Sequence, residues 1–183
     1  MVGNSGHHEL IGGTMASGSI FDFPNPVNDK AARTVATGVV LMALLVAVLG
    51  WGWVLVPLTY GFVARVLAGP KLSPLGRFAT EFAAPRLGDP RFTPGPPKRF
   101  AQGIGVAFSV TASLLWLLGF AGASKVVVAM LAGAAFLEAA LGFCLGCRVF
   151  ALLMKAGIVP DSVCEECNDL SLRIPGLVGA KLD

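Results

Sequence analysis

Charged side chains are scarce in this sequence. They make up 14% of the 183 residues, against about 25% in an average soluble domain. None occurs from Thr34 to Ala64. The hydrocarbon core of a bilayer tolerates neither unpaired charge nor unpaired backbone groups, so long charge-free runs are typical of membrane-spanning segments. The scarcity argues against a soluble domain and predicts an integral membrane protein.

Histidine is almost absent as well. The only two, His7 and His8, are adjacent near the N-terminus. No nucleotide-binding glycine motif, HExxH or Ser–His–Asp arrangement occurs, so hydrolytic chemistry has no candidate base. Residues 1–27 also lack the basic start and apolar stretch of a cleavable signal peptide. Their glycine, serine, asparagine and proline content predicts a disordered N-terminal tail.

Long apolar segments, by contrast, are plentiful. A single span needs ~20 residues, so the charge-free run is too long for one helix, and Gly50-Trp51-Gly52-Trp53 predicts a turn between spans at about 31–49 and 53–68. Two more spans are expected at about 102–120 and 124–147, the last continuing as a helix to Ala156. The fold class is therefore all-α, a polytopic four-helix transmembrane bundle over residues 28–156. A three-span arrangement is the alternative.

The bundle includes a proline- and arginine-rich basic loop at residues 70–100. Within it, Ser73 is a typical N-cap and Pro74 a typical first helical residue. Leu75, Phe78 and Phe82 fall on one face of the helix that follows. We expect this helix to lie flat at the membrane surface. At the start of the first span, Asn28 and Asp29 supply an N-cap and a first-turn acid.

Lysine and arginine are distributed unevenly between the two sides of the expected bundle. All of them except Lys125 lie in three regions. These are the stretch before the first span, the 70–100 loop with its flanks, and the stretch after the fourth span. Because basic loops stay on the cytoplasmic side, we expect a protein of the cell (plasma) membrane with both termini cytoplasmic. Trp51, Trp53 and Trp116 then lie toward the outer interface, where indoles are favoured.

The four cysteines all lie in the last quarter of the chain. Cys144 and Cys147 form one CxxC pair, and Cys164 and Cys167 form a second after sixteen intervening residues. In the expected fold, the first pair leaves one face of the fourth helix near its inner end. The second pair lies in a cytoplasmic tail, residues 157–183, where Ser162-Val-Cys-Glu has capping-box spacing and places Cys164 in the first turn of a short helix. If the chain reverses at Gly157, all four sulfur atoms converge.

Two interpretations of these cysteines stay open. As metal ligands, Cys144, Cys147, Cys164 and Cys167 match the spacing of a tetrathiolate site, which would hold zinc or iron and fasten the tail to the bundle. As dithiols, Cys164 would be the exposed attacking thiolate and Cys167 its resolving partner, with the first pair at the membrane end. Permanent disulfides are disfavoured in the reducing cytoplasm. The place of the first pair at the end of a transmembrane helix favours thiol chemistry.

Glu138 is the only acid inside an expected span. Ionised and unpaired it would cost roughly 2.5–3.5 kcal/mol, so it must be protonated, paired or in a polar cavity. It borders a stripe of small residues that includes Gly142 and Gly146 and fits helix packing or a homo-oligomer. We expect a neutral carboxyl hydrogen-bonded to Ser109 and Ser113 of the third span; a proton relay is the alternative.

Three segments together resemble a known family: FPNPVNDKAARTVA before the first span, GPPKRFAQGIG before the third, and FCLGCRVFALL with CEECND at the end. They resemble a bacterial, mainly actinobacterial, family of small integral membrane proteins catalogued only as a domain of unknown function. The resemblance implies a multi-pass membrane domain with a cysteine-rich cytoplasmic end. It also favours a thioredoxin-like or sulfurtransferase partner in the cytoplasm.

The sequence thus predicts one of two functions. The first is thiol–disulfide exchange or sulfur transfer at a four-cysteine site on the cytoplasmic face. The second is a non-enzymatic membrane scaffold or small transporter, whose cysteines bind structural zinc or iron. The expected partners are the lipid bilayer and a cytoplasmic protein, and no nucleic acid.

Overall fold

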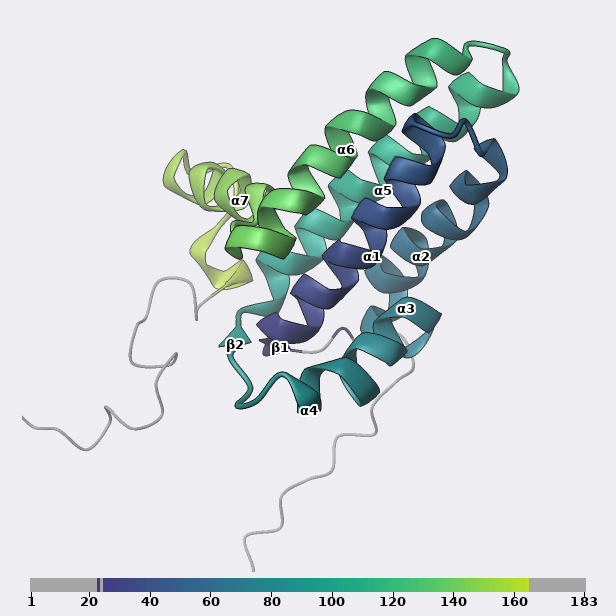
Figure 1. The fold of residues 1–183 in the computed structure, drawn as a ribbon. Coiled ribbons are helices and arrows are strands. Elements are labelled where there is room, and N and C mark those ends of the chain that lie inside the picture. The colour runs from purple at the N-terminus through teal and green to yellow at the C-terminus, as the bar shows by residue number, and fades with distance from the viewer. Residues whose placement is uncertain (1–22, 24, 165–183) are drawn as a thin grey trace, which may run out of the picture.

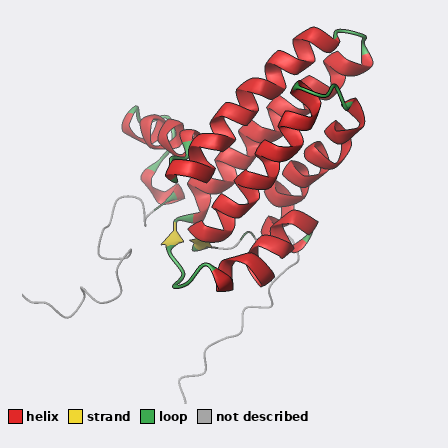
Figure 2. Ribbon diagram, viewed as in Figure 1, coloured by secondary structure: helices red, strands yellow, loops and turns green. Residues whose placement is uncertain are grey.

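Four long helices run side by side and form the body of the protein (Figures 1 and 2). The computed structural model describes residues 23 and 25–164. The four helices are α1 (Asp29–Ala47), α2 (Leu55–Ala68), α5 (Gly95–Leu117) and α6 (Ala121–Leu141). Within the described part of the chain, four helical segments are long and apolar enough to cross a membrane, the second being Gly52–Lys71. The expected all-α transmembrane bundle is confirmed.

The two connections at one end of the bundle are short. Gly50, with φ of +71°, and a 3-10 turn, Gly52–Val54, join α1 to α2, as the Gly-Trp-Gly-Trp segment predicts. Three residues, Leu118 to Phe120, join α5 to α6. The ring of Trp116 lies against Gly52, so the three tryptophans gather at this end.

The basic loop folds across the other end of the bundle (Figure 1). It contains α3 (Pro74–Arg77), a wider π-helical stretch (Phe78–Ala83) and α4 (Ala84–Arg86). Ser73 caps this segment as expected, since its Oγ accepts a hydrogen bond from the Gly76 N–H at 3.2 Å. Leu75 packs against Gly38 of α1, whereas Phe78 and Phe82 are exposed and free to face the membrane surface.

A two-stranded antiparallel sheet joins the end of the basic loop to the residues just before α1. This sheet was not predicted from the sequence. Strand β1 (Val27–Asn28) pairs with β2 (Phe92–Thr93). Just before β1, Asn25 Oδ1 accepts a hydrogen bond from Gly95 N–H at 2.7 Å. Asn25, which lies in the tail expected at 1–27, is therefore already part of the folded structure. Most of the tails expected at 1–27 and 157–183, Cys167 included, lies outside the described residues.

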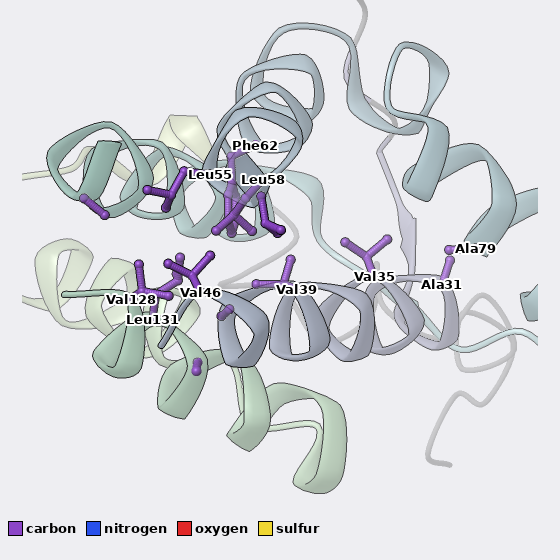
Figure 3. Packing of buried hydrophobic residues seen from close by; sticks show 14 of the residues in the cluster. Ala31, Val35, Val39, Val46, Leu55, Leu58, Phe62, Ala79, Val128 and Leu131 are labelled. Atoms are coloured by element: carbon purple, nitrogen blue, oxygen red, sulfur yellow. The ribbon is translucent and has the colours of Figure 1, made fainter. Parts of the chain in front are cut away.

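The core is built from small and β-branched side chains (Figure 3). Val39 and Val46 of α1 and Leu58 of α2 are almost completely buried, and Val128 of α6 meets them from the other side. Helix α1 packs most extensively on α6, and α2 on α5. Such small side chains let the helices approach closely, as is usual where packing rather than the hydrophobic effect holds a membrane bundle together.

The fourth long helix is shorter than expected. It ends at Leu141, and a separate helix, α7 (Leu145–Lys155), leaves the bundle at a steep angle (Figure 1). The expected continuous helix to Ala156 is wrong. Gly142 stops α6 in the left-handed conformation, with φ of +67°, and the N–H groups of Gly142 and Phe143 bond back to the carbonyls of Glu138 and Leu137. This is the usual way for a glycine to end a helix.

We predict that replacing Gly105 by alanine destabilises the protein, whereas replacing Gly103, on the same helix α5, does not. A Cβ at Gly105 would lie 2.1 Å from Phe62 Cε1, whereas one at Gly103 meets nothing within 4 Å. Gly105→Ala should lower the free energy of unfolding by about 1–3 kcal/mol through overpacking. Gly103→Ala should change it little. Thermal unfolding of the purified protein in detergent measures both, and equal effects would contradict the packing of α2 on α5.

Candidate functional site

The first CxxC pair lies where α6 gives way to α7. Cys144 is the N-cap of α7, and its Sγ accepts a hydrogen bond from the Cys147 backbone N–H at 3.3 Å. Cys147 lies in the first turn of the same helix. The expectation that both thiols leave one face of the fourth helix is therefore wrong. The pair instead belongs to a helix N-terminus, which favours negative charge on sulfur.

The environment makes the two thiols unequal. The pKa of Cys144 is lowered, chiefly because the Cys147 thiol donates a hydrogen bond to its sulfur. The same hydrogen bond, together with burial, raises the pKa of Cys147. Burial and the charge of Glu138 act against the Cys144 thiolate, and the charge of Lys98 supports it. These effects favour the thiolate form at Cys144 and the protonated form at Cys147.

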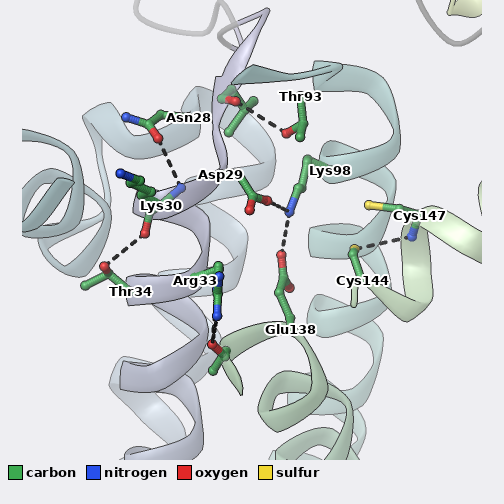
Figure 4. A network of polar contacts seen from close by, with 12 residues as sticks. Asn28, Asp29, Lys30, Arg33, Thr34, Thr93, Lys98, Glu138, Cys144 and Cys147 are labelled. Atoms are coloured by element: carbon green, nitrogen blue, oxygen red, sulfur yellow. Dashed lines mark hydrogen bonds and ion pairs between the residues drawn. The ribbon is translucent and has the colours of Figure 1, made fainter. Parts of the chain in front are cut away.

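A buried ion cluster lies directly beside this pair (Figure 4). Lys98 Nζ is 2.7 Å from Glu138 Oε1 and 3.1 Å from Asp29 Oδ1. The lysine side chain is 7% exposed. Because the three residues come from α5, α6 and α1, the cluster joins three of the four long helices at the end that leads to α7.

Glu138 is thus paired with a lysine, and the expected hydrogen bonds to serines are absent. Ser109 Oγ donates to the Val106 carbonyl, and Ser113 Oγ donates to the Ser109 carbonyl and lies 3.1 Å from Thr59 Oγ1. Both hydroxyls are therefore used within α5 and toward α2.

The sequence did not identify Lys98 as the partner, because it was counted in the basic loop. In the structure α5 begins at Gly95, several residues before the expected start, and Lys98 is inside the helix. The Pro96-Pro97 pair was the available signal, since proline is favoured in the first turn.

Arg33 of α1 completes this end of the bundle. Its guanidinium donates hydrogen bonds to the carbonyls of Ala139, at 3.1 and 3.2 Å, and of Ala140, at 2.9 Å. These are among the last carbonyls of α6, which have no partner within the helix. A cation there also complements the negative end of the helix dipole. Arg33 therefore stabilises the point at which α6 stops.

Two cavities meet at Cys144. One, of about 500 Å³, is lined by Asp29, Lys98, Cys147 and Arg148 among others. The second, of about 300 Å³, lies among the long helices and is mostly apolar. Cys144 lines both cavities. A thiol in this position can be approached from the polar side and from within the bundle.

The second CxxC pair is only partly described. Cys164 follows a 3-10 turn, Asp161–Val163. It is 3% exposed and disulfide-bonded, so it is not the exposed thiolate that the sequence predicted. The short helix expected around it continues into residues outside the described part of the chain. Cys167 lies outside the described residues. The convergence of four sulfurs, and with it a zinc or iron site, stays a prediction. Within residues 25–164 no three histidine, cysteine or acidic side chains are grouped to hold a metal.

We predict that removing Lys98 destabilises the bundle. Lys98→Met leaves two largely buried carboxylates uncompensated, and breaking a buried ion pair in this way costs about 3–5 kcal/mol. The double variant Lys98→Met/Glu138→Met should lose less than Lys98→Met alone.

The matched control is the exposed pair of Arg77 and Glu81, which are 3.2 Å apart and whose side chains are 61% and 65% exposed. Arg77→Met should cost less than about 1 kcal/mol. Unfolding of the purified protein by increasing denaturing detergent measures all three variants. Equal losses in the free energy of unfolding for Lys98→Met and Arg77→Met would show that the buried cluster does not stabilise the bundle.

Comparison with known proteins identifies a family. A family model described as a domain of unknown function, DUF4395, matches residues 27–155. No curated protein and no solved structure matches the chain. The matched region runs from β1 to the last residue of α7 and includes the ion cluster, Cys144 and Cys147. With well over half of its length matched, the chain belongs to the DUF4395 family.

Proposed function

We propose that this protein performs thiol–disulfide exchange or sulfur transfer at the membrane surface, with Cys144 as the attacking thiolate and Cys147 as the resolving thiol. One observation carries the proposal: Cys144 caps α7 and accepts hydrogen bonds from Cys147 while lining a cavity of about 500 Å³. A thiolate stabilised at a helix N-terminus, with a second thiol three residues on, is the arrangement that thiol exchange requires.

The first step is attack on a partner's disulfide. The Cys144 thiolate forms a bond to one sulfur, and the other sulfur leaves as a thiolate that takes up a proton. The mixed disulfide no longer carries the negative charge of Cys144. The hydrogen bond to the Cys144 thiolate, the largest cause of the raised pKa of Cys147, is then lost, so Cys147 can lose its proton more readily. It attacks Cys144 Sγ, closes the Cys144–Cys147 disulfide and releases the partner as a dithiol.

Sulfur transfer uses the same nucleophile. Attack of the Cys144 thiolate on the outer sulfur of thiosulfate leaves a Cys144 persulfide and releases sulfite, with no net change in electrons. The partner is then a cytoplasmic thioredoxin-like protein or sulfurtransferase that docks over the polar cavity. Exposed Arg148 lies on that cavity's wall and gives the docking surface a positive charge.

The proposal includes the placement of the site in the cell. The distribution of lysine and arginine supports a plasma-membrane protein whose two termini and α7 lie on the cytoplasmic side. The exposed side chains of Leu145, Val149 and Leu152 form an apolar stripe along α7 at helical spacing. Such a stripe suits a helix lying in the membrane interface. The proposed roles of Cys144 and Cys147 replace those first expected for Cys164 and Cys167.

Replacement of Cys147 should trap the exchange intermediate. In a background of Cys164→Ser and Cys167→Ser, the Cys147→Ser variant should retain one glutathione on Cys144 after treatment with glutathione disulfide. The parent should release glutathione and form the Cys144–Cys147 disulfide, because Cys147 resolves the adduct. Cys144→Ser is the matched control and should form little adduct. Intact-protein mass spectrometry measures all three, and an equal adduct on Cys147 in Cys144→Ser would reverse the assignment.

The pH dependence of alkylation provides a separate prediction. The thiolate is the reactive form, so Cys144 in the folded protein should still react with iodoacetamide below the ordinary cysteine pKa of 9.0, and its rate should fall only as the pH drops through the lowered value. Cys147 should stay slow throughout this range. Residue-resolved mass spectrometry measures both rates. After unfolding, the two should titrate alike, and identical profiles in the folded protein would refute the inequality.

A further inference from the structure

We propose that the apolar cavity behind Cys144 binds the ring of a membrane-dissolved quinone, which accepts the electrons of the Cys144–Cys147 dithiol. This inference rests on the proposed thiol exchange run in the reverse direction, in which a cytoplasmic dithiol reduces the Cys144–Cys147 disulfide. It adds the oxidant that restores that disulfide. It starts from the cavity of about 300 Å³ that is lined by residues of α1, α2, α5, α6 and the start of α7. That volume is at the lower end of the range for small-molecule sites, which are mostly apolar with a few placed polar groups.

The lining of the cavity is divided into an apolar body and a polar end. Val39, Phe62, Phe108 and Leu131 contribute to the body. Among the described lining residues, the polar side chains are those of Gln102 and Glu138, with the thiol of Cys144 beside them. All three lie toward the end of the bundle at which α7 begins. The cavity therefore suits a molecule with one hydrogen-bonding end and an apolar remainder.

The position of the cavity restricts what can reach it. Its body lies between membrane-spanning helices, so a ligand entering from the bilayer must dissolve in lipid. Its polar end fits a quinone carbonyl in particular. Gln102 turns its amide oxygen to Arg65 Nε at 2.9 Å, so its NH₂ group is the donor available to a ligand oxygen. Glu138 lines the same polar end of the cavity as Cys144.

The chemistry balances without another reagent. Cys144 and Cys147 together give up two electrons and two protons as the S–S bond forms. The quinone takes up both and leaves as the quinol. Cys144 lines the polar cavity as well, so the same sulfur that receives electrons from an aqueous dithiol can pass them to an acceptor in the membrane. The protein would thus connect a cytoplasmic thiol pool to the quinone pool.

The test uses the full-length reduced protein in detergent and decylubiquinone, whose ring carbons are all substituted, so that direct arylation of thiols is blocked. We expect one quinol for each Cys144–Cys147 disulfide formed, followed by quinone absorbance and by mass spectrometry. Cys144→Ser should abolish the reaction. If the unaltered protein exchanges with glutathione disulfide but forms no quinol, the quinone proposal fails and the proposed function stands. If neither reaction occurs, both fail.

A pair of α6 variants tests the cavity itself. Ala134 lines the cavity, and Ala134→Phe should fill it and slow quinol formation about tenfold or more. Ala129 is exposed on the same helix and does not line it, so Ala129→Phe should react as the parent does. Both variants should exchange normally with glutathione disulfide, which also shows that they are folded. Equal quinol rates in the two variants would place the reaction outside this cavity and overturn the assignment.

Discussion

The pairing of one buried lysine with two carboxylates determines the geometry at the functional end of this protein. Lys98 lies between Glu138 and Asp29 and so links α5 to both α6 and α1. In a lipid environment such a contact is hard to replace, because each partner left alone is a charge without water. The cluster holds the last turn of α6 in place, and only three residues separate the end of α6 from the start of α7.

The position of Cys144, the proposed nucleophile, depends on this arrangement through the end of α6. Gly142 turns the chain, Arg33 covers the carbonyls that the turn leaves open, and Cys144 becomes the cap of the next helix. Had α6 continued, Cys144 and Cys147 would be two ordinary thiols on a helix face. The helix break therefore makes the environments of the two cysteines unequal, and it places Cys144, the proposed nucleophile, between a polar and an apolar cavity.

Much of the fold follows from local sequence signals. The apolar runs and the Gly-Trp-Gly-Trp turn specify the spans, and the caps at Asn28 and Ser73 need only neighbouring residues. The site was harder to predict, for a physical reason in each case. Gly142 and Gly146 have the spacing of a helix-packing motif, and only the three-dimensional structure shows that Gly142 ends a helix while Gly146 packs against Ala101.

The partner of Glu138 was difficult to predict for a similar reason. Positive charge near a span is expected from topology alone, so nothing distinguished Lys98 from its basic neighbours until α5 was seen to begin at Gly95. The pairing of Lys98 with Glu138 spans forty residues in sequence and depends on how α5 and α6 pack. Cysteine is also an uncommon capping residue, so a CxxC at the end of an apolar run gave no clear sign of a new helix.

The short turns at the tryptophan end have a consequence for biogenesis. They make α1–α2 and α5–α6 two helical hairpins, each able to enter the bilayer as a unit. Yet α1 packs more extensively on α6 than on its own hairpin partner α2. The ion cluster takes residues from both hairpins, Asp29 from the first and Lys98 and Glu138 from the second, so it forms only when the two units associate. A chain halted before that stage lacks the contacts from Asp29 and Arg33 of α1, so the turn that leads to Cys144 is held in place only in the assembled bundle.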